Sequence, residues 1–240
     1  MTTSAPIVDC RTDAAAGGHS PASRGSAPYY QHGLVTIYLS PAEELLESLP
    51  ACDLLLTDPP YPDYEKGWEI PDVSWVLGNI RAKKKLIFWP CLLAPPLPAP
   101  KAEHIWEKPN GRSAHWYEKI YGYGSVQARS KIYRVAAILP NYSQYAAECV
   151  NHPCQKPLKL IRKLIQETAP TCITDCFMGS GTTLVAAKEA GIPCIGIDSR
   201  EEYCEQAAKR LSQEQLNLAQ NGKASDAAGR MQKEDENARK

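Results

Sequence analysis

The fold class of this chain is decided by the stretch Thr171-Cys172-Ile173-Thr174-Asp175-Cys176-Phe177-Met178-Gly179-Ser180-Gly181-Thr182-Thr183. Its first part, 171–176, predicts a strand, and 182–190 predicts a helix that ends before Gly191. A strand followed by Gly-x-Gly and a helix presents backbone N–H groups and a helix N-terminus to a ligand. Downstream, 193–198 predicts another strand and 200–211 another helix.

The same alternation of strand and helix signals precedes this stretch. Short apolar segments predict strands over 34–39, 53–57 and 85–89. Ser40-Pro41-Ala42-Glu43 has the pattern of a capping box with proline at the first helical position, and it predicts a helix to about Ser48. Apolar residues at helical spacing predict another helix over 158–167. Repeated β-α units with nearly all-apolar strands predict an α/β fold, with a mostly parallel sheet covered by helices on both faces.

Composition excludes several classes of protein. The chain has 240 residues, 27 basic and 27 acidic side chains, 43% apolar residues and nine cysteines. No segment approaches the roughly 18 apolar residues of a membrane span, and the N-terminus does not resemble a secretory signal. An odd number of cysteines scattered through core segments fits reduced thiols, so we expect a cytoplasmic location. We predict a disordered leader over 1–30, one domain over 31–212 and a polar tail over 213–240.

The glycine loop narrows the choice of ligand. A P-loop needs Lys-Ser/Thr after its last glycine, but Gly181 is followed by Thr182. A dinucleotide fingerprint needs a third small residue where Leu184 stands. An adenosyl ligand without pyrophosphate remains, and Asp198, 17 residues after Gly181, is placed to accept hydrogen bonds from both ribose hydroxyls. The alternative is that Gly-x-Gly forms only a tight turn.

Asp58-Pro59-Pro60-Tyr61 follows an apolar strand, at the position where α/β sheets place their sites. A proline turn accounts for the two prolines, but not for the acid before them and the aromatic after them. An exocyclic amine on a nucleobase is a poor nucleophile, and the Asp58 carboxylate with the Pro59 carbonyl can accept both of its hydrogens. Tyr61 can stack on a base turned out of a duplex.

At these residues the chain resembles the S-adenosylmethionine-dependent DNA amino-methyltransferases, which modify adenine N6 or cytosine N4. The resemblance covers 31–212, and the catalytic tetrapeptide precedes the cofactor loop, as in the circularly permuted β-class order. It implies a Rossmann-like methyltransferase fold. The motifs that carry it are Asp58-Pro59-Pro60-Tyr61, His152-Pro153-Cys154-Gln155-Lys156-Pro157, Asp175 to Thr183, and Gly196-Ile197-Asp198 with Tyr203.

The resemblance implies roles for individual residues. The catalytic pocket would be formed by Asp58, Pro59, Pro60 and Tyr61. S-adenosylmethionine would be bound by Asp175, Phe177, Gly179, Gly181, Thr182, Thr183 and Asp198, with His152 and Lys156 near its methionine end. The chain departs from the family at Cys176, where proline is frequent, and at Cys154, where threonine or serine is frequent.

Asp58 favours adenine N6 as the methyl acceptor, because the cytosine-N4 branch more often has serine at that position. Cytosine N4 remains the nearest alternative. RNA or a protein side-chain amide as acceptor, and a cofactor-binding module without catalysis, are further alternatives.

The middle of the chain is locally basic. Seven bases against three acids give a net charge of +4 between Lys101 and Arg134, interleaved with six aromatic residues. This pattern suits phosphate contacts and base stacking, although an ordinary hairpin with core aromatics is equally compatible, and Trp106 fits that core role. We expect double-stranded DNA to contact Arg112, Lys119 and Arg129, within a target-recognition insert over about 101–150. A homodimer is possible, and a partner endonuclease is left open.

No metal site is predicted. Cys149, His152 and Cys154 lie near one another in sequence, but they form no C-x-x-C pair.

Overall fold

The computed structural model of the chain describes residues 27–61, 73–111, 116–138 and 155–212. Within these ranges, nine strands form one sheet in the order β1-β2-β9-β8-β3-β4-β6-β5-β7. The strands are β1 Tyr30–His32, β2 Val35–Leu39, β3 Cys52–Thr57, β4 Ala82–Pro90, β5 Ala102–Glu107, β6 Tyr117–Gly124, β7 Ile132–Arg134, β8 Ile173–Asp175 and β9 Cys194–Asp198. The helices are α1 Ala42–Leu45, α2 Val73–Asn79, α3 Leu158–Thr168 and α4 Thr182–Glu189, and residues 201–212 are also helical.

The centre of the sheet is parallel. Strands β2, β9, β8, β3 and β4 pair in parallel, with Leu39 opposite Asp198 and Thr57 opposite Ile87. Every β3 side chain is buried, as expected for a strand covered on both faces. This arrangement confirms the predicted α/β class. It also brings the carboxyl ends of β3, β8 and β9 to one edge of the sheet.

One side of the sheet is antiparallel. Strand β6 runs antiparallel to both β4 and β5, and β7 then pairs with β5 in parallel. Strands β5, β6 and β7 therefore extend the central sheet. Their predicted role in target recognition stays a prediction.

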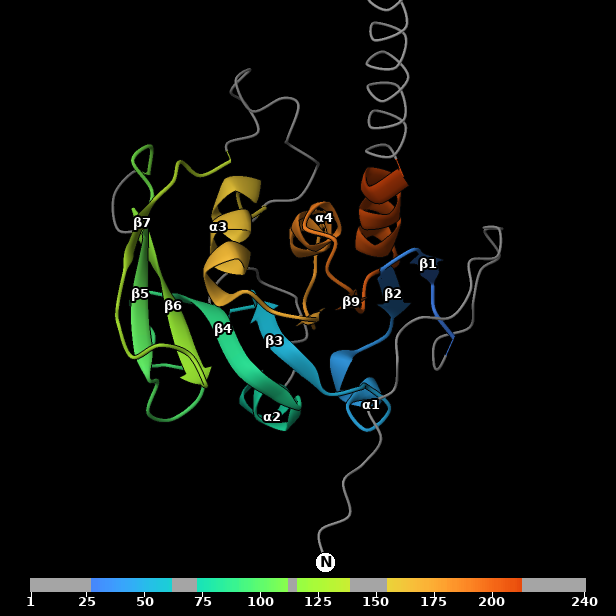
Figure 1. Ribbon diagram of the computed structural model, residues 1–240, viewed down its shortest axis with the longest axis horizontal. Helices are drawn as coiled ribbons and strands as arrows, with labels where there is room; N and C mark the ends of the chain where they lie inside the picture. Colours follow the sequence, from blue (N-terminus) through green and yellow to red (C-terminus); the bar gives the residue numbers. More distant parts are fainter. Residues whose placement is uncertain (1–26, 62–72, 112–115, 139–154, 213–240) are drawn as a thin grey trace, which may run out of the picture.

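Helices cover both faces of this sheet (Figure 1). Helices α3, α4 and the 201–212 helix pack on one face through a core that includes Leu160, Leu184 and Leu211. Helices α1 and α2 pack on the other face, where Leu45 and Leu77 belong to a second core. None of the helices in the described ranges is long and apolar enough to cross a membrane.

The predicted capping box is wrong. Helix α1 begins at Ala42 after Pro41, and no side chain caps it. The Ser40 hydroxyl instead contacts the Glu44 carboxylate at 3.2 Å and the Pro41 carbonyl at 3.1 Å. The Ser40 backbone N–H donates to the Asp198 carbonyl at 3.0 Å, which ties this residue to the sheet rather than to the helix.

The predicted leader and tail lie mainly outside the described residues. Tyr30, the last leader residue, begins β1, and Tyr29 donates its N–H to the Ile37 carbonyl at 2.8 Å. The domain limits stay predictions.

Candidate active site

The parallel topology places three carboxylates at the carboxyl ends of neighbouring strands. Asp58 comes directly after β3, while Asp175 and Asp198 are the last residues of β8 and β9. Strands β3 and β8 are neighbours, and the Thr57 hydroxyl donates to Asp175 Oδ1 at 2.7 Å. The sheet therefore brings the predicted catalytic tetrapeptide and the glycine loop together at one edge, where α/β proteins bind ligands.

Both oxygens of the Asp58 carboxylate accept hydrogen bonds. The Tyr61 hydroxyl donates to Oδ1, and the Lys156 ammonium donates to Oδ2. Burial raises the pKa of Asp58, the adjacent Lys156 ammonium opposes this effect, and the nearby Glu118 carboxylate adds to it. A carboxylate has about four lone-pair positions, so an ionised Asp58 can still accept hydrogen bonds from a substrate.

Lys156 lies between two carboxylates. Its ammonium approaches Glu118 Oε2 at 3.3 Å, and Glu118 Oε1 is bonded to Lys108 at 2.5 Å. The Lys156 side chain is only 9% exposed and lies over the rings of Phe88 and Trp106, at 5.2 and 5.7 Å from their centroids. Sequence reasoning placed Lys156 with the cofactor, but the structure shows its ammonium on Asp58. Its role toward the cofactor stays a prediction.

Glu118 was not predicted as a site residue. Burial alone would raise its pKa, but the ammonium groups of Lys156 and Lys108 outweigh burial and lower it. The carboxylate is therefore held ionised beside the catalytic pocket. The only sequence signal for it was its position among the basic residues of the middle segment.

Tyr61 packs against a residue that the sequence did not single out. Its ring meets Trp89 edge to face, with centroids 5.5 Å apart and planes at 84°. Trp89 is buried near the end of β4 and donates its indole N–H to the Ala94 carbonyl at 2.6 Å. The proline-rich segment after β4 thus fixes Trp89, and Trp89 fixes Tyr61 beside Asp58. Pro59 and Pro60 hold the chain between these residues, and Pro59 is buried.

The glycine loop encloses Asp198. The Gly179 N–H donates to Asp198 Oδ2 and the Arg200 N–H to Oδ1, each at 3.0 Å. Burial raises the pKa of Asp198 to about 6, and these two amide hydrogen bonds oppose the rise. Gly179 has φ +49°, a conformation that glycine adopts at little cost. The loop and the Asp198 carboxylate therefore form one unit.

The end of the loop needs Gly181 for two reasons. Its φ is +76°, and a Cβ atom there would lie 2.8 Å from the Ala207 Cβ. Gly181 is the N-cap of α4, whose first residues, Thr182 and Thr183, are buried. The close packing lets the α4 N-terminus lie directly beside the 201–212 helix.

Other predicted cofactor residues are bonded within the protein. Asp175 Oδ1 accepts from the Thr57 hydroxyl and, at 3.2 Å, from the Phe177 N–H. Burial raises the pKa of Asp175 to about 6, against the effect of hydrogen bonds from Thr183 and Thr57. The Thr182 hydroxyl accepts from Arg210 at 3.0 Å. These contacts shape the loop, and the direct cofactor contacts of Asp175, Phe177, Thr182 and Thr183 stay predictions.

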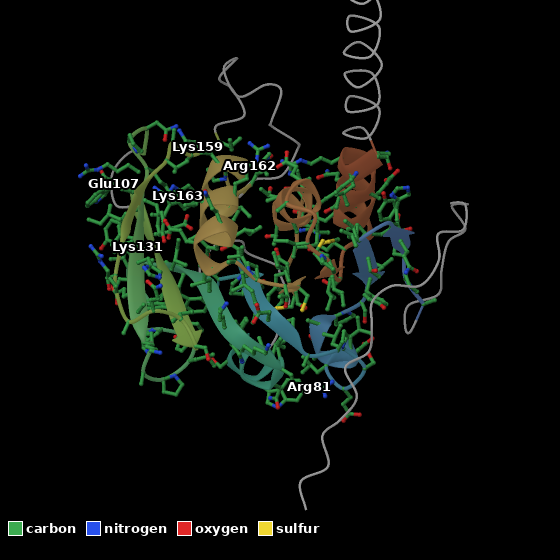
Figure 2. All side chains as sticks on the ribbon, in the orientation of Figure 1. Arg81, Glu107, Lys131, Lys159, Arg162 and Lys163 are labelled. Carbon is green, nitrogen blue, oxygen red and sulfur yellow. The ribbon has the colours of Figure 1, made fainter. Side chains whose placement is uncertain are left out.

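Two of the three predicted DNA-contact residues, Lys119 and Arg129, lie in the described part of the chain. Lys119 pairs with Glu103 at 3.1 Å, whereas the exposed Arg129 borders a cavity between the sheet and α3. Lys131, which is labelled in Figure 2, lines the same cavity and pairs with Glu167 at 2.8 Å. Arg112 lies outside the described residues, as do His152 and Cys154 of the predicted cofactor motif.

Burial leaves few aromatic side chains of the described middle segment accessible for stacking on bases. Trp106 is a core residue as predicted, but Tyr121, Tyr123 and Tyr133 are buried as well. The burial of these three tyrosines favours the core alternative over base stacking, since Tyr121 and Tyr123 lie on β6 between β4 and β5, and Tyr133 lies on the edge strand β7. Trp116 is 48% exposed and contacts Tyr117. Within the described ranges no group of three or more His, Cys, Asp and Glu side chains could hold a metal ion.

Comparisons with known proteins agree with this geometry. A family model for N6 and N4 methyltransferases, described as DNA methylase, matches residues 79–209, more than half of the chain. The type II methyltransferase M2.DpnII of Streptococcus pneumoniae is 32% identical over 117 residues, which are 46% of this chain and 41% of that protein. M.ScaI of Streptomyces caespitosus is 24% identical over 80% of this chain and 86% of its own length.

Two solved structures share the fold. The PvuII DNA methyltransferase (cytosine-N4-specific) has a TM-score of 0.58 and 17% identity, covering 78% of this chain and 89% of its own. A complex of M1.HpyAVI with SAM has a TM-score of 0.54 and 21% identity, covering 74% and 98%. The match spans less than half of M2.DpnII and 23% of M2.LlaDCHI of Lactococcus lactis subsp. cremoris. By the family model, which covers the sheet edge with Asp175 and Asp198, the chain belongs to the N6/N4 DNA methylase family.

Proposed function

We propose that this chain transfers a methyl group from S-adenosylmethionine to the exocyclic N6 of adenine in double-stranded DNA. The observation that carries the proposal is the position of Asp58. Its carboxylate lies at the carboxyl end of a central strand, next to the strand that leads into the glycine loop. An acceptor for an amine and a candidate cofactor loop thus occupy adjacent strand ends.

The residues of the loop fit an adenosyl cofactor. Asp198 is a largely buried carboxylate whose two oxygens each accept one backbone hydrogen bond, which leaves lone pairs for ribose hydroxyls. Gly179 and Gly181 let the backbone approach closely, and the α4 N-terminus offers N–H groups to a carboxylate such as that of the methionine moiety. When bound, the cofactor supplies an electrophilic methyl group on a positively charged sulfur.

The chain's own residues act on the acceptor amine. The Asp58 carboxylate and the Pro59 carbonyl accept its two hydrogens, which favours a tetrahedral nitrogen with a free lone pair. Proline fixes the direction of that carbonyl because its φ is locked. Tyr61, held by Trp89, provides an aromatic surface next to Asp58. The amine nitrogen itself bonds to the methyl carbon as the bond from that carbon to sulfur breaks, and the nitrogen then releases one proton. No covalent bond to the protein is needed, and the protein contributes mainly orientation.

Adenine is the proposed base because position 58 is an aspartate. Cytosine N4 would use the same geometry, and the test below distinguishes the two bases. For DNA contacts we propose Arg112, Lys119 and Arg129.

The proposal is tested by expressing the chain in a host that lacks DNA methylation and sequencing single DNA molecules for modified bases. N6-methyladenine at a short recurring motif supports the proposal. N4-methylcytosine keeps the mechanism and overturns the choice of base. An unmodified genome, with folded protein that binds the cofactor, overturns DNA as the substrate.

The first prediction concerns Asp58. Asp58→Ala removes the acceptor of the amine hydrogens, so methylation is expected to fall by at least about 100-fold. Cofactor affinity, measured by calorimetry, is expected to change less than about threefold, because the Asp198 unit is intact. Weak cofactor binding with normal turnover would contradict the role given to Asp58.

A further inference from the structure

Four alternating charges connect the catalytic pocket to the antiparallel side of the sheet. Asp58, Lys156, Glu118 and Lys108 form a row in which each charge contacts one of opposite sign. Their side chains are between 9% and 20% exposed. They come from distant parts of the chain, since Asp58 follows β3, Lys156 precedes α3, and Lys108 and Glu118 belong to the β5–β6 region.

We propose that Lys156 is a positioning residue for Asp58 and that Glu118 holds it in place. The proposal rests on the proposed function of Asp58 as the acceptor of the amine hydrogens. It adds to that function two residues, Lys156 as partner of the catalytic carboxylate and Glu118 as partner of Lys156.

Geometry directs the ammonium of Lys156 toward Asp58. The ammonium lies over two aromatic rings, with a carboxylate on either side. It donates to Asp58 Oδ2 while Tyr61 donates to Oδ1, so the plane of the Asp58 carboxylate is fixed from both ends. An amine of a flipped base then meets an acceptor of fixed direction.

The row also sets the protonation state of Asp58. Among the described residues, the groups that face Asp58 are the Lys156 ammonium, the Glu118 carboxylate, the Tyr61 hydroxyl and, from β8, the Asp175 carboxylate. Without Lys156, Asp58 would be a buried carboxylate near two others, and it would hold its proton to higher pH. A protonated Asp58 has an O–H in place of one acceptor position and cannot receive both amine hydrogens.

Lys156 and Glu118 carry opposite charges, so removing them is expected to shift the pH profile in opposite directions. A purely structural role would not produce opposite shifts. Lys156→Met removes a positive charge and is expected to move the acid limb of the methylation rate to higher pH. Glu118→Gln removes a negative charge and is expected to move the same limb to lower pH. At pH 7, Lys156→Met is expected to lose about 10- to 100-fold in rate. Lys156→Arg is expected to keep the wild-type limb.

The control is Lys159→Met. Lys159 is an exposed lysine three residues away on α3, labelled in Figure 2. Lys159→Met also removes one positive charge but leaves the four charges of the row unchanged, so the pH profile of this variant is expected to match that of wild type. Cofactor affinity is measured for every variant. A loss of activity in Lys156→Met that is wholly explained by weaker cofactor binding would place Lys156 with the cofactor and overturn the proposal.

A second readout does not depend on activity. The carboxyl carbon of Asp58 is followed by NMR in protein labelled at aspartate, with Asp58→Asn identifying its signal. The titration midpoint is expected to rise in Lys156→Met and fall in Glu118→Gln. Unchanged midpoints overturn the proposal. An inactive wild-type protein with shifted midpoints overturns the proposed function alone, so the two failures are distinguishable.

Discussion

At the scale of single residues, two glycines that both have a positive φ angle have different surroundings. Gly181 has φ +76° and a neighbouring Cβ at 2.8 Å, whereas Gly191 has φ +68° and nothing within 4 Å of an added Cβ. Any L-residue in this conformation costs roughly 1–2 kcal/mol. The additional steric cost is confined to Gly181, because only there does a second helix lie against the loop.

We therefore predict that Gly181→Ala lowers the free energy of unfolding by about 1–3 kcal/mol more than Gly191→Ala does. The difference isolates the overlap with Ala207, because both variants share the backbone cost. Chemical denaturation of the two variants and wild type measures it. Equal losses would mean that Ala207 moves away without cost. Gly181→Ala is also expected to weaken cofactor binding, since the overlap displaces the α4 N-terminus.

Contacts between site residues that are far apart in sequence could not be predicted from the sequence. The order Asp58, glycine loop, Asp198 was predictable because each motif is local and ends a strand. The contact of Lys156 with Asp58 joins residues 98 positions apart, and Glu118 reaches the same ammonium from another strand. Neither pattern is visible locally, because a lysine before a helix and a glutamate in a basic segment are both ordinary surface features.

At the scale of elements, α3 shows which interactions hold a helix to the sheet. Leu160, Ile161 and Leu164 are at most 1% exposed in the core of that face. On the outer side, Arg162, which is labelled in Figure 2, forms a bidentate ion pair with Glu189 of α4 at 2.6 and 2.5 Å. The Arg162 side chain is 52% exposed, so water screens much of this attraction.

We predict that Leu164→Ala lowers the free energy of unfolding by about 2–5 kcal/mol, because it leaves a cavity in a closely packed core. Arg162→Met, which removes the ion pair but keeps an aliphatic stem, is expected to cost less than about 1 kcal/mol. Urea denaturation of both variants tests the ranking. A larger loss for Arg162→Met would show that the α3–α4 ion pair, and not the apolar face, fixes the helix.

The elements that the sequence predicted are short apolar strands and helices with a regular apolar period. Helix α3 and the strand–loop–helix unit around Gly181 were predicted to within a few residues. Helix α2 was missed because it has only seven residues, and Gly78 and Trp75 interrupt any regular apolar period in them. Strand β6 was missed because Ile120 is its only aliphatic residue, and its tyrosines and glycines resemble a loop. Tertiary burial against β4 and β5 decides its structure.

At the scale of the whole molecule, the sheet gathers buried carboxylates at one edge. Asp175 and Asp198 both have pKa values raised to about 6 because burial disfavours their charge. Asp58 shifts in the same direction and is the third of these groups. A fold that places its acids at the ends of apolar parallel strands therefore loses stability when they ionise. The proposed ligand sites require that ionisation, because an ionised carboxylate can turn both oxygens to the ribose or amine hydrogens, whereas a protonated one carries an O–H at one of them.

We predict opposite pH trends for stability and cofactor binding through Asp198. The folded state holds its proton up to about pH 6, while the unfolded chain releases it near the ordinary value of 3.8. Stability from this group is thus full below about pH 4 and falls as the pH rises through 6, by about 3 kcal/mol. Cofactor affinity is expected to rise over the same window, as the ionised form accepts the ribose hydroxyls.

Asp198→Asn removes the titration while keeping the size of the side chain. Its free energy of unfolding is expected to fall less than that of wild type between pH 4 and 6, and the remaining fall reflects Asp175 and Asp58. Its cofactor affinity is expected to be low at every pH. Denaturant titrations and calorimetry at pH 4.5 and 7 measure the two trends. A variant whose stability falls as steeply as that of wild type would show that Asp198 already ionises at its ordinary pKa in the folded chain.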